Sequence, residues 1–97
     1  TMILEIACIE IAPENHEAFR AAIGRAVEQE LSASPGFIDF TLHQGIERPE
    51  AYQLHIRWET LEDHTIGFRE SKRFTAWRDI IGGFFVAPPS VEHWSTN

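Results

Sequence analysis

The chain has 97 residues, 43 % of them hydrophobic, and its 15 acidic and 8 basic side chains give a formal net charge of −7. This length and composition favour one folded domain, residues 1–97, with a modest core, and exclude a disordered chain. The negative charge argues against nucleic-acid binding, which needs basic side chains to neutralise phosphates, and no apolar run is long enough to cross a membrane.

Cys8 is the single cysteine, so an intramolecular disulfide is excluded and we expect a small buried apolar side chain. The five histidines lie at positions 16, 43, 55, 64 and 93. Because they lack zinc-ligand spacing and no glycine-rich phosphate loop is present, no metal or flavin cofactor is predicted. The start of the chain shows no signal peptide, so we expect a cytoplasmic protein without membrane partners.

The first half of the chain predicts a strand, a helix and a second strand. Residues 2–11, "MILEIACIEI", are rich in isoleucine, and both of their faces carry apolar side chains. Pro13 and Asn15 then suit a helix start, and apolar residues follow at helical spacing as far as Leu31. Pro35 and Gly36 end this helix. In residues 37–44, alternation predicts Ile38, Phe40 and Leu42 on one face.

The second half predicts a strand, a helix in two segments and a last strand. Residues 51–58 alternate, with Tyr52, Leu54, Ile56 and Trp58 on the apolar side. Thr60 and Asp63 resemble a capping box, and Leu61, His64, Thr65 and Phe68 then fall on one helical face. Ser71 can cap a further segment, and residues 90–95 predict a short strand.

The order strand, helix, strand, strand, helix, strand is that of the ferredoxin-like βαββαβ fold, an α+β fold with a four-stranded antiparallel sheet. Both helices lie on one face of such a sheet. The other face would leave an apolar patch in water, so self-association to a homodimer is expected.

Three stretches of the chain resemble the antibiotic biosynthesis monooxygenase (ABM) domain, a family of dimeric α+β-barrel proteins. They are "SPGFIDFTLH", "YQLHIRW" and "WETLEDHTIGFRESKRFTAW", in which Trp58, Ser71, Phe74 and Trp77 match the family's pattern. The resemblance implies a homodimeric barrel and a pocket between sheet and helices. It also implies oxidation of a small phenolic or quinol-type aromatic molecule with dioxygen, without metal or flavin.

Two departures from the family pattern bear on activity. The family often places a histidine three residues before the serine of the second helix, where this chain has Phe68; His64, one turn earlier, could take its place. The haem-degrading branch uses an asparagine in the first strand and a late axial histidine. Here that strand has no asparagine and the late position holds Arg78, so haem degradation is not expected.

His64 is the principal catalytic candidate, because an imidazole titrates near neutrality and can accept a phenolic proton. The alternative is a structural histidine bonded to its surroundings. Arg57 is the second catalytic candidate and could stabilise negative charge that develops on a substrate oxygen.

The candidate substrate-binding residues are aromatic walls and polar strand positions: Trp58, Phe68, Trp77, His43 and His55. The aromatic residues could equally be plain core, and the two histidines could line a pocket or the dimer barrel, or simply face water. Likewise the cations Arg69, Lys72, Arg73 and Arg78 could form a solvated face or contact an acidic ligand. Two functions remain open: a cofactor-independent monooxygenase, or a non-catalytic dimer that binds a small ligand.

Overall fold

The computed structural model describes residues 2–96. Its strands and helices are β1 (Ile3–Glu10), α1 (His16–Ala26), β2 (Phe37–Gln44), β3 (Ala51–Trp58), α2 (Lys72–Ile81) and β4 (Ser90–Ser95). A 3₁₀ turn, Pro13–Asn15, precedes α1, and a π-helical turn, Val27–Leu31, follows it. A second π-helical turn, Asp63–Phe68, precedes α2, and the 3₁₀ turn Gly82–Phe84 follows α2.

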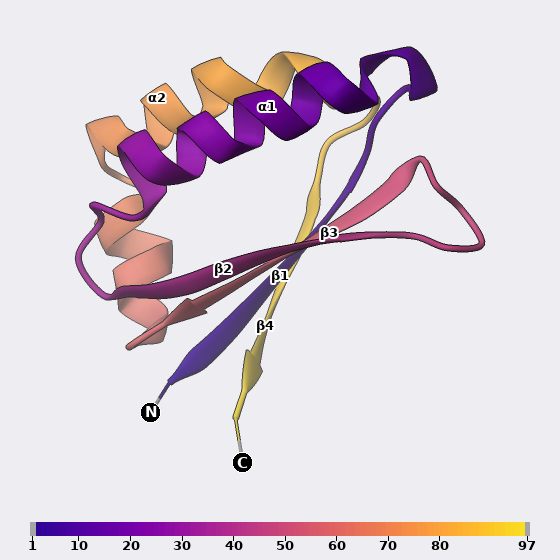
Figure 1. Ribbon diagram of the computed structural model, residues 1–97. Helices are drawn as coiled ribbons and strands as arrows, with labels where there is room; N and C mark the ends of the chain where they lie inside the picture. The colour runs from indigo at the N-terminus through magenta and orange to yellow at the C-terminus, as the bar shows by residue number, and fades with distance from the viewer. Residues whose placement is uncertain (1, 97) are drawn as a thin grey trace.

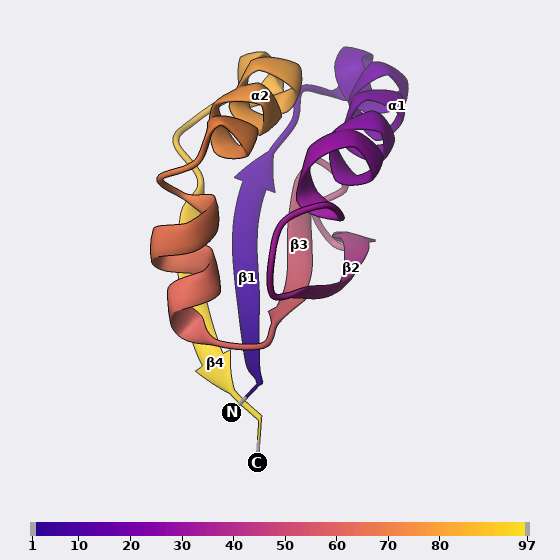
Figure 2. The same ribbon diagram turned by 90° about the vertical axis from the view of Figure 1, so that its left-hand side faces the viewer.

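The four strands form one antiparallel sheet in the order β2-β3-β1-β4. Both helices and the Asp63–Phe68 turn cover the same face of this sheet, and the other face is open in the single chain (Figures 1 and 2). The predicted α+β, ferredoxin-like architecture is therefore confirmed. None of the helices in residues 2–96 has the length and apolar character that a membrane crossing needs.

The core lies between the sheet and the helices. Alternate residues of β3 face it, and all four are buried: Tyr52, Leu54, Ile56 and Trp58. Phe19 of α1 packs edge-on against Tyr52, with 5.2 Å between ring centroids. Burial of each large apolar side chain stabilises the fold by roughly 1.5–3 kcal/mol, so the strand alternation and the helical stripe determine which side of the sheet the helices cover.

The predicted orientation of Ile38 is wrong. The register of the β2–β3 pair shifts between Phe37 and Asp39, so that Phe37 opposes Trp58 and Ile38 is an extra residue. Such a bulge reverses the alternation of side chains across it. Phe37 therefore packs against Trp58, at 6.1 Å between ring centroids, while Ile38 is exposed.

The helical face predicted from Leu61 to Phe68 is only partly present. His64 and Phe68 are buried, but Leu61 is 38 % exposed. The amide of Arg69 donates to the carbonyl of His64, five residues earlier, as in a π-helix. This wider turn needs more residues per revolution, so Leu61 does not complete the face that ideal α-helical spacing would give it.

Both predicted helix caps, Thr60 and Ser71, accept a backbone hydrogen bond, whereas the predicted burial of Cys8 is wrong. The amide of Asp63 donates to Thr60 Oγ1 at 3.1 Å, and the amide of Phe74 donates to Ser71 Oγ at 3.3 Å. Cys8, expected to be buried, is exposed, because it points to the face of the sheet that carries no helices.

Gly36 fixes where the segment after β3 begins. Its φ of 83° lies in the left-handed region, which glycine adopts at little cost. A Cβ atom there would also collide with the carboxylate of Asp63. The carbonyl of Gly36 accepts a hydrogen bond from Glu59, at 2.8 Å. The turn before β2 thus holds the start of the Asp63–Phe68 turn, and with it His64, close to the sheet.

Candidate functional site

A cavity of about 230 Å³ lies between the sheet, the Asp63–Phe68 turn and α2. Most of its lining is apolar, with aromatic walls from Phe68, Phe74, Trp77 and Phe85. The polar groups that line it are Glu5, His64, Arg69 and Arg78. An apolar cavity with a few convergent polar groups is the usual form of a small-molecule site.

Glu5 is a buried carboxyl group on the sheet side of this cavity. It lies on the parity of β1 that faces the helices, together with Ala7 and Ile9, and is 5 % exposed. Trp58 Nε1 donates a hydrogen bond to Glu5 Oε1 at 2.9 Å. Burial raises the pKa of Glu5 to about 7, against the smaller lowering effects of the Trp58 bond and of Arg69. Glu5 can therefore gain or lose a proton near neutral pH.

His64 lies between Glu5 and His93. Its Nε2 is 3.3 Å from Glu5 Oε1, and its Nδ1 is 2.7 Å from His93 Nε2. The ring is 3 % exposed and stacks on Trp58 at 5.3 Å between centroids. Burial, with smaller contributions from Arg69 and His93, lowers the pKa of His64 to about 3, so the imidazole is neutral.

Glu5, His64 and His93 form a row of hydrogen-bonding groups across three elements. His93 comes from β4, is partly exposed, and has a pKa that burial and then Arg69 lower. The three side chains are arranged in series, with His64 in the middle, rather than converging on one point. Among residues 2–96, no three histidine, cysteine or acidic side chains are grouped as metal ligands would be. The arrangement suits the movement of a proton.

The sequence reasoning missed Glu5 and His93, although a signal was present. Glu5 is an acidic residue within the isoleucine-rich first strand, on the same parity as Ala7 and Ile9. A charge among apolar positions is costly to bury without a partner, so it marks a site or a structural pair. His93 shares its parity with Val91 in the same way.

The structure brings together three of the predicted site residues in this cavity: His64, Phe68 and Trp77. Trp58 is fully buried behind His64 and supports the ring and Glu5 rather than lining the cavity.

Three other predicted site residues lie elsewhere: Arg57, His55 and His43. They point to the helix-free face, where Arg57 forms an ion pair with Asp39 and the rings of His43 and His55 are 4.3 Å apart. The sheet separates these side chains from the cavity of the same chain.

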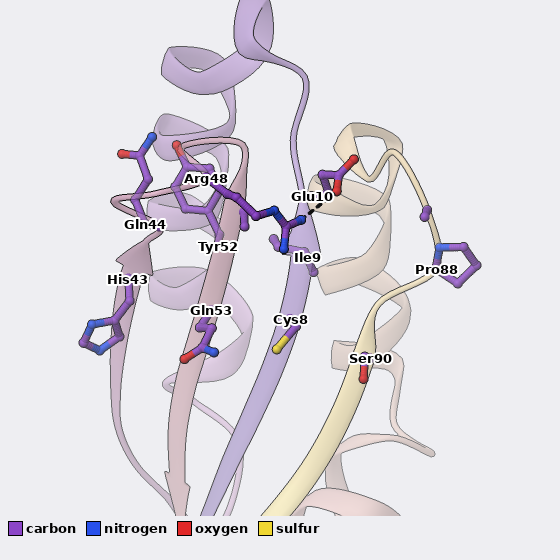
Figure 3. Close-up of a pocket in the computed structure, with 13 residues that line it drawn as sticks. Cys8, Ile9, Glu10, His43, Gln44, Arg48, Tyr52, Gln53, Pro88 and Ser90 are labelled. Atoms are coloured by element: carbon purple, nitrogen blue, oxygen red, sulfur yellow. Dashed lines mark hydrogen bonds and ion pairs between the residues drawn. The ribbon is translucent and has the colours of Figure 1, made fainter.

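A larger, open hollow of about 430 Å³ lies on the helix-free side, near one end of the sheet. Cys8, His43, Gln53 and Ser90, one from each strand, are among the residues that line it, and Figure 3 shows them in front of the sheet with the ribbons of the helices behind. Arg48 at its edge is ion-paired with Glu10 at 3.3 Å. Cys8, His43, Gln53 and Ser90 are exposed in this hollow, whereas Glu5 and His64 are buried beside the cavity between sheet and helices, so that cavity is the better candidate for chemistry.

Comparison with known proteins shows which family the chain resembles over most of its length. Residues 2–80 match the family model described as antibiotic biosynthesis monooxygenase. The uncharacterised protein YczJ of Bacillus subtilis is 34 % identical over 93 residues, which cover 96 % of this chain and 97 % of YczJ.

Solved structures with similar folds include proteins described as monooxygenases. One, described as a candidate antibiotic biosynthesis monooxygenase from Bordetella bronchiseptica, is 35 % identical with a TM-score of 0.92, over 99 % of this chain and 97 % of that one. The monooxygenase from the gene ActVA-Orf6 of Streptomyces coelicolor, solved with the ligand nanaomycin D, shares the fold at 15 % identity. Its TM-score is 0.83, over 98 % of this chain and 87 % of that one.

Proposed function

Because the chain belongs to the antibiotic biosynthesis monooxygenase family, we propose that it is a cofactor-independent monooxygenase that oxidises a small aromatic or quinol-type molecule with dioxygen. The observation that carries this proposal is the buried Glu5–His64 pair beside an aromatic-walled cavity. A carboxyl group whose pKa is about 7 can accept a phenolic proton at neutral pH.

The proposed reaction is balanced by the substrate alone. A phenol with a free ring position loses its O–H hydrogen and one ring hydrogen and gains one oxygen atom, which gives a quinone. The second oxygen atom leaves with these two hydrogens as water. The four electrons that reduce dioxygen all come from the ring, so no external reductant is needed. Removal of the phenolic proton is the step that makes the ring electron-rich enough to react.

Each group of the cavity has a role in this scheme. Glu5 accepts the phenolic proton and His64 fixes the carboxyl group, while Trp58 holds both through its hydrogen bond and its stacked ring. Phe68 and Trp77 provide flat walls for the substrate ring. Arg69 and Arg78, which line the same cavity, place positive charge near oxygen atoms that become negative.

The volume of the cavity supports a small substrate. A cavity of about 150 Å³ holds benzene, and about 230 Å³ is available here. The proposed substrate therefore has one or two rings, and larger polycyclic molecules would require the aromatic walls to move.

The helix-free face supports the homodimer that is part of this proposal. Leu4 and Ile6 of β1 are only half-buried on this face, and Trp94 of β4, opposite Leu4, is 51 % exposed. A second copy that covers this face would bury all three and Cys8. Such pairing would also put Arg57, His55 and His43 at the interface.

A non-catalytic ligand-binding dimer is the second candidate function. One observation favours it: both ring nitrogens of His64 already have protein partners, as those of a structural histidine do. Under this alternative the cavity binds an aromatic molecule and releases it unchanged.

The deciding experiment is oxygen uptake by purified protein treated with a chelator, with a one-ring quinol and a two-ring naphthol as substrates. The proposal expects uptake in the wild type, a fall of about 10²–10⁴-fold in Glu5→Gln, and no change in the control Glu70→Gln, an exposed residue outside the cavity. Calorimetric binding of the aromatic molecule without oxygen uptake would support the ligand-binding alternative. Uptake that disappears with the chelator would contradict the cofactor-free reaction.

A further inference from the structure

His93 connects the buried pair to the edge of the sheet. β4 is an edge strand, and the β1–β4 register places His93 directly opposite Glu5. Figure 2 shows β4 and the segment that carries His64 side by side at this edge. Glu5 and His64 are 5 % and 3 % exposed, whereas His93 is partly exposed. Of the three groups, His93 is the one with access to water.

The row Glu5, His64, His93 has two complementary proton arrangements. In the first, Glu5 is ionised, His64 directs its Nε2–H toward Glu5, and its Nδ1 accepts a hydrogen bond from His93 Nε2–H. In the second, Glu5 is protonated and directs its O–H toward His64 Nε2, while His64 Nδ1–H donates to His93 Nε2. The distances of 3.3 Å and 2.7 Å serve both arrangements.

We infer that His93 is the outer member of a proton relay that connects the substrate site at Glu5, through His64, with solvent at the β4 edge. This inference rests on the proposed function and assigns it a positioning and proton-transfer residue outside the cavity. Glu5 accepts the phenolic proton while His64 and His93 each carry their proton on Nδ1, which gives the second arrangement. Glu5 then passes its proton to His64 Nε2, whose lone pair faces it. His64 releases its Nδ1 proton to His93 Nε2, and His93 releases its other ring proton to water.

The relay gives a path for the proton that must leave the substrate and for the proton that must return during the reaction. The phenolic proton must leave before the ring reacts, and a proton must return when the second oxygen atom departs as water. No net proton is released in the balanced reaction, so the same path serves in both directions. Without it, a proton on Glu5 would be held on a side chain that is only 5 % exposed.

The charges around the relay favour the neutral form of both of its histidines. Arg69, which follows the Asp63–Phe68 turn, acts on all three groups and opposes a second positive charge. Glu5 on β1 is the acidic group that faces His64, and Arg78 on α2 lines the cavity. The neighbours of His93 in β4, Glu92 and Trp94, lie on the opposite parity and face away from His64. An imidazolium at His93 is therefore disfavoured, which favours release of its proton to water.

The first test replaces His93 by Gln and, to retain a ring, by Phe. In dilute non-nucleophilic buffer the relay predicts that kcat falls about 10²-fold in both variants, while the affinity for the aromatic substrate is unchanged. Added imidazole, which can carry protons from the edge of β4, restores turnover in His93→Gln. The control is His16→Gln, a histidine near the opposite end of the core that bonds the carbonyl of Ile11. Equal kcat values in His93→Gln and His16→Gln would overturn the relay.

The second test does not depend on activity. Nitrogen NMR of protein with labelled histidine should show a coupling across the hydrogen bond between His64 Nδ1 and His93 Nε2 in the wild type. Absence of this coupling overturns the relay even if the protein oxidises its substrate. Conversely, a coupling in a protein that takes up no oxygen leaves the hydrogen bond in place but overturns the proposed function and, with it, the catalytic role of His93.

Discussion

Glu5 Oε1 and His64 Nε2 lie 3.3 Å apart, and neither residue is more than 5 % exposed. Burial favours the neutral form of each, because it raises the pKa of the carboxyl group and lowers the pKa of the imidazole. The neutral pair, in which Glu5 carries the proton, is thus more favourable than a buried ion pair in which His64 carries it. This relationship underlies both the proposed chemistry and the pH dependence of stability.

The pH dependence of stability should differ in sign between the variants Glu5→Gln and His64→Gln. Folding raises the pKa of Glu5 from 4.5 to about 7, so its favourable contribution is lost as pH rises through that range. Folding lowers the pKa of His64 from 6.5 to about 3, so its contribution is lost as pH falls through that range. Between pH 4.5 and 6.5 the folded state holds a proton on Glu5 while the unfolded state holds one on His64, and the two effects cancel.

Relative to the wild type, Glu5→Gln should therefore gain stability as pH rises in this window, with a slope of about 1.4 kcal/mol per pH unit. His64→Gln should lose stability with the opposite slope. Urea unfolding at several pH values measures both slopes. Slopes of the same sign in the two variants would show that the groups do not titrate as an opposed pair.

Trp58→Phe should shift the pH profile of activity. The indole donates to Glu5 and helps to lower the pKa of its carboxyl group, so its loss should raise that pKa further. The acid limb of the kcat profile should then move to higher pH, and stability should fall by roughly 1–3 kcal/mol because a buried acceptor loses its partner. The matched control is Trp77→Phe, which changes the cavity wall without a bond to Glu5; its acid limb should stay in place.

Association through the helix-free face can be tested at Trp94. The wild type should scatter light as a species of about twice the 11.1 kDa chain mass. Trp94→Glu places a charge at the proposed interface and should weaken the dimer at micromolar concentration. Ile66→Glu, at a similarly exposed position on the helix-bearing side, should leave the dimer unchanged. A wild-type monomer over the whole concentration range would contradict the barrel.

The turn at Gly36 should be intolerant of a side chain. Gly36→Ala forces a non-glycine residue to a φ of 83° and directs its Cβ at the Asp63 carboxylate. We expect a loss of roughly 1–3 kcal/mol, as for other strained backbone positions. Gly24→Ala is the control, since it lies in α1 with open space around it, and it should stabilise by roughly 0.5–1 kcal/mol. Thermal unfolding measures both changes.

Much of the fold was predictable from local patterns. The alternation in residues 51–58 and the stripe from Phe19 to Leu31 reflect one physical requirement, that apolar side chains leave water on one side of an element. The Pro35–Gly36 stop reflects backbone geometry, because proline has no N–H to donate and glycine adopts a positive φ at little cost. The same reasoning predicted that His64 and Phe68 share a buried face. Where a bulge or a π-helical turn changes the spacing, as at Ile38 and Leu61, the pattern misplaces a side chain, because the sequence alone does not show which hydrogen-bond register the backbone adopts.

The composition of the site was decided by tertiary structure. Glu5, His64 and His93 are separated by 59 and 29 positions between successive members, yet sheet pairing and the turn after β3 bring them into one row. Tertiary structure likewise places the sheet between Arg57 and the cavity, although Arg57 is next to Trp58 in the chain. Local periodicity determines which face of an element a residue occupies, but only the packing of elements determines which residues from distant parts of the chain share a buried space, and burial is what sets their pKa values.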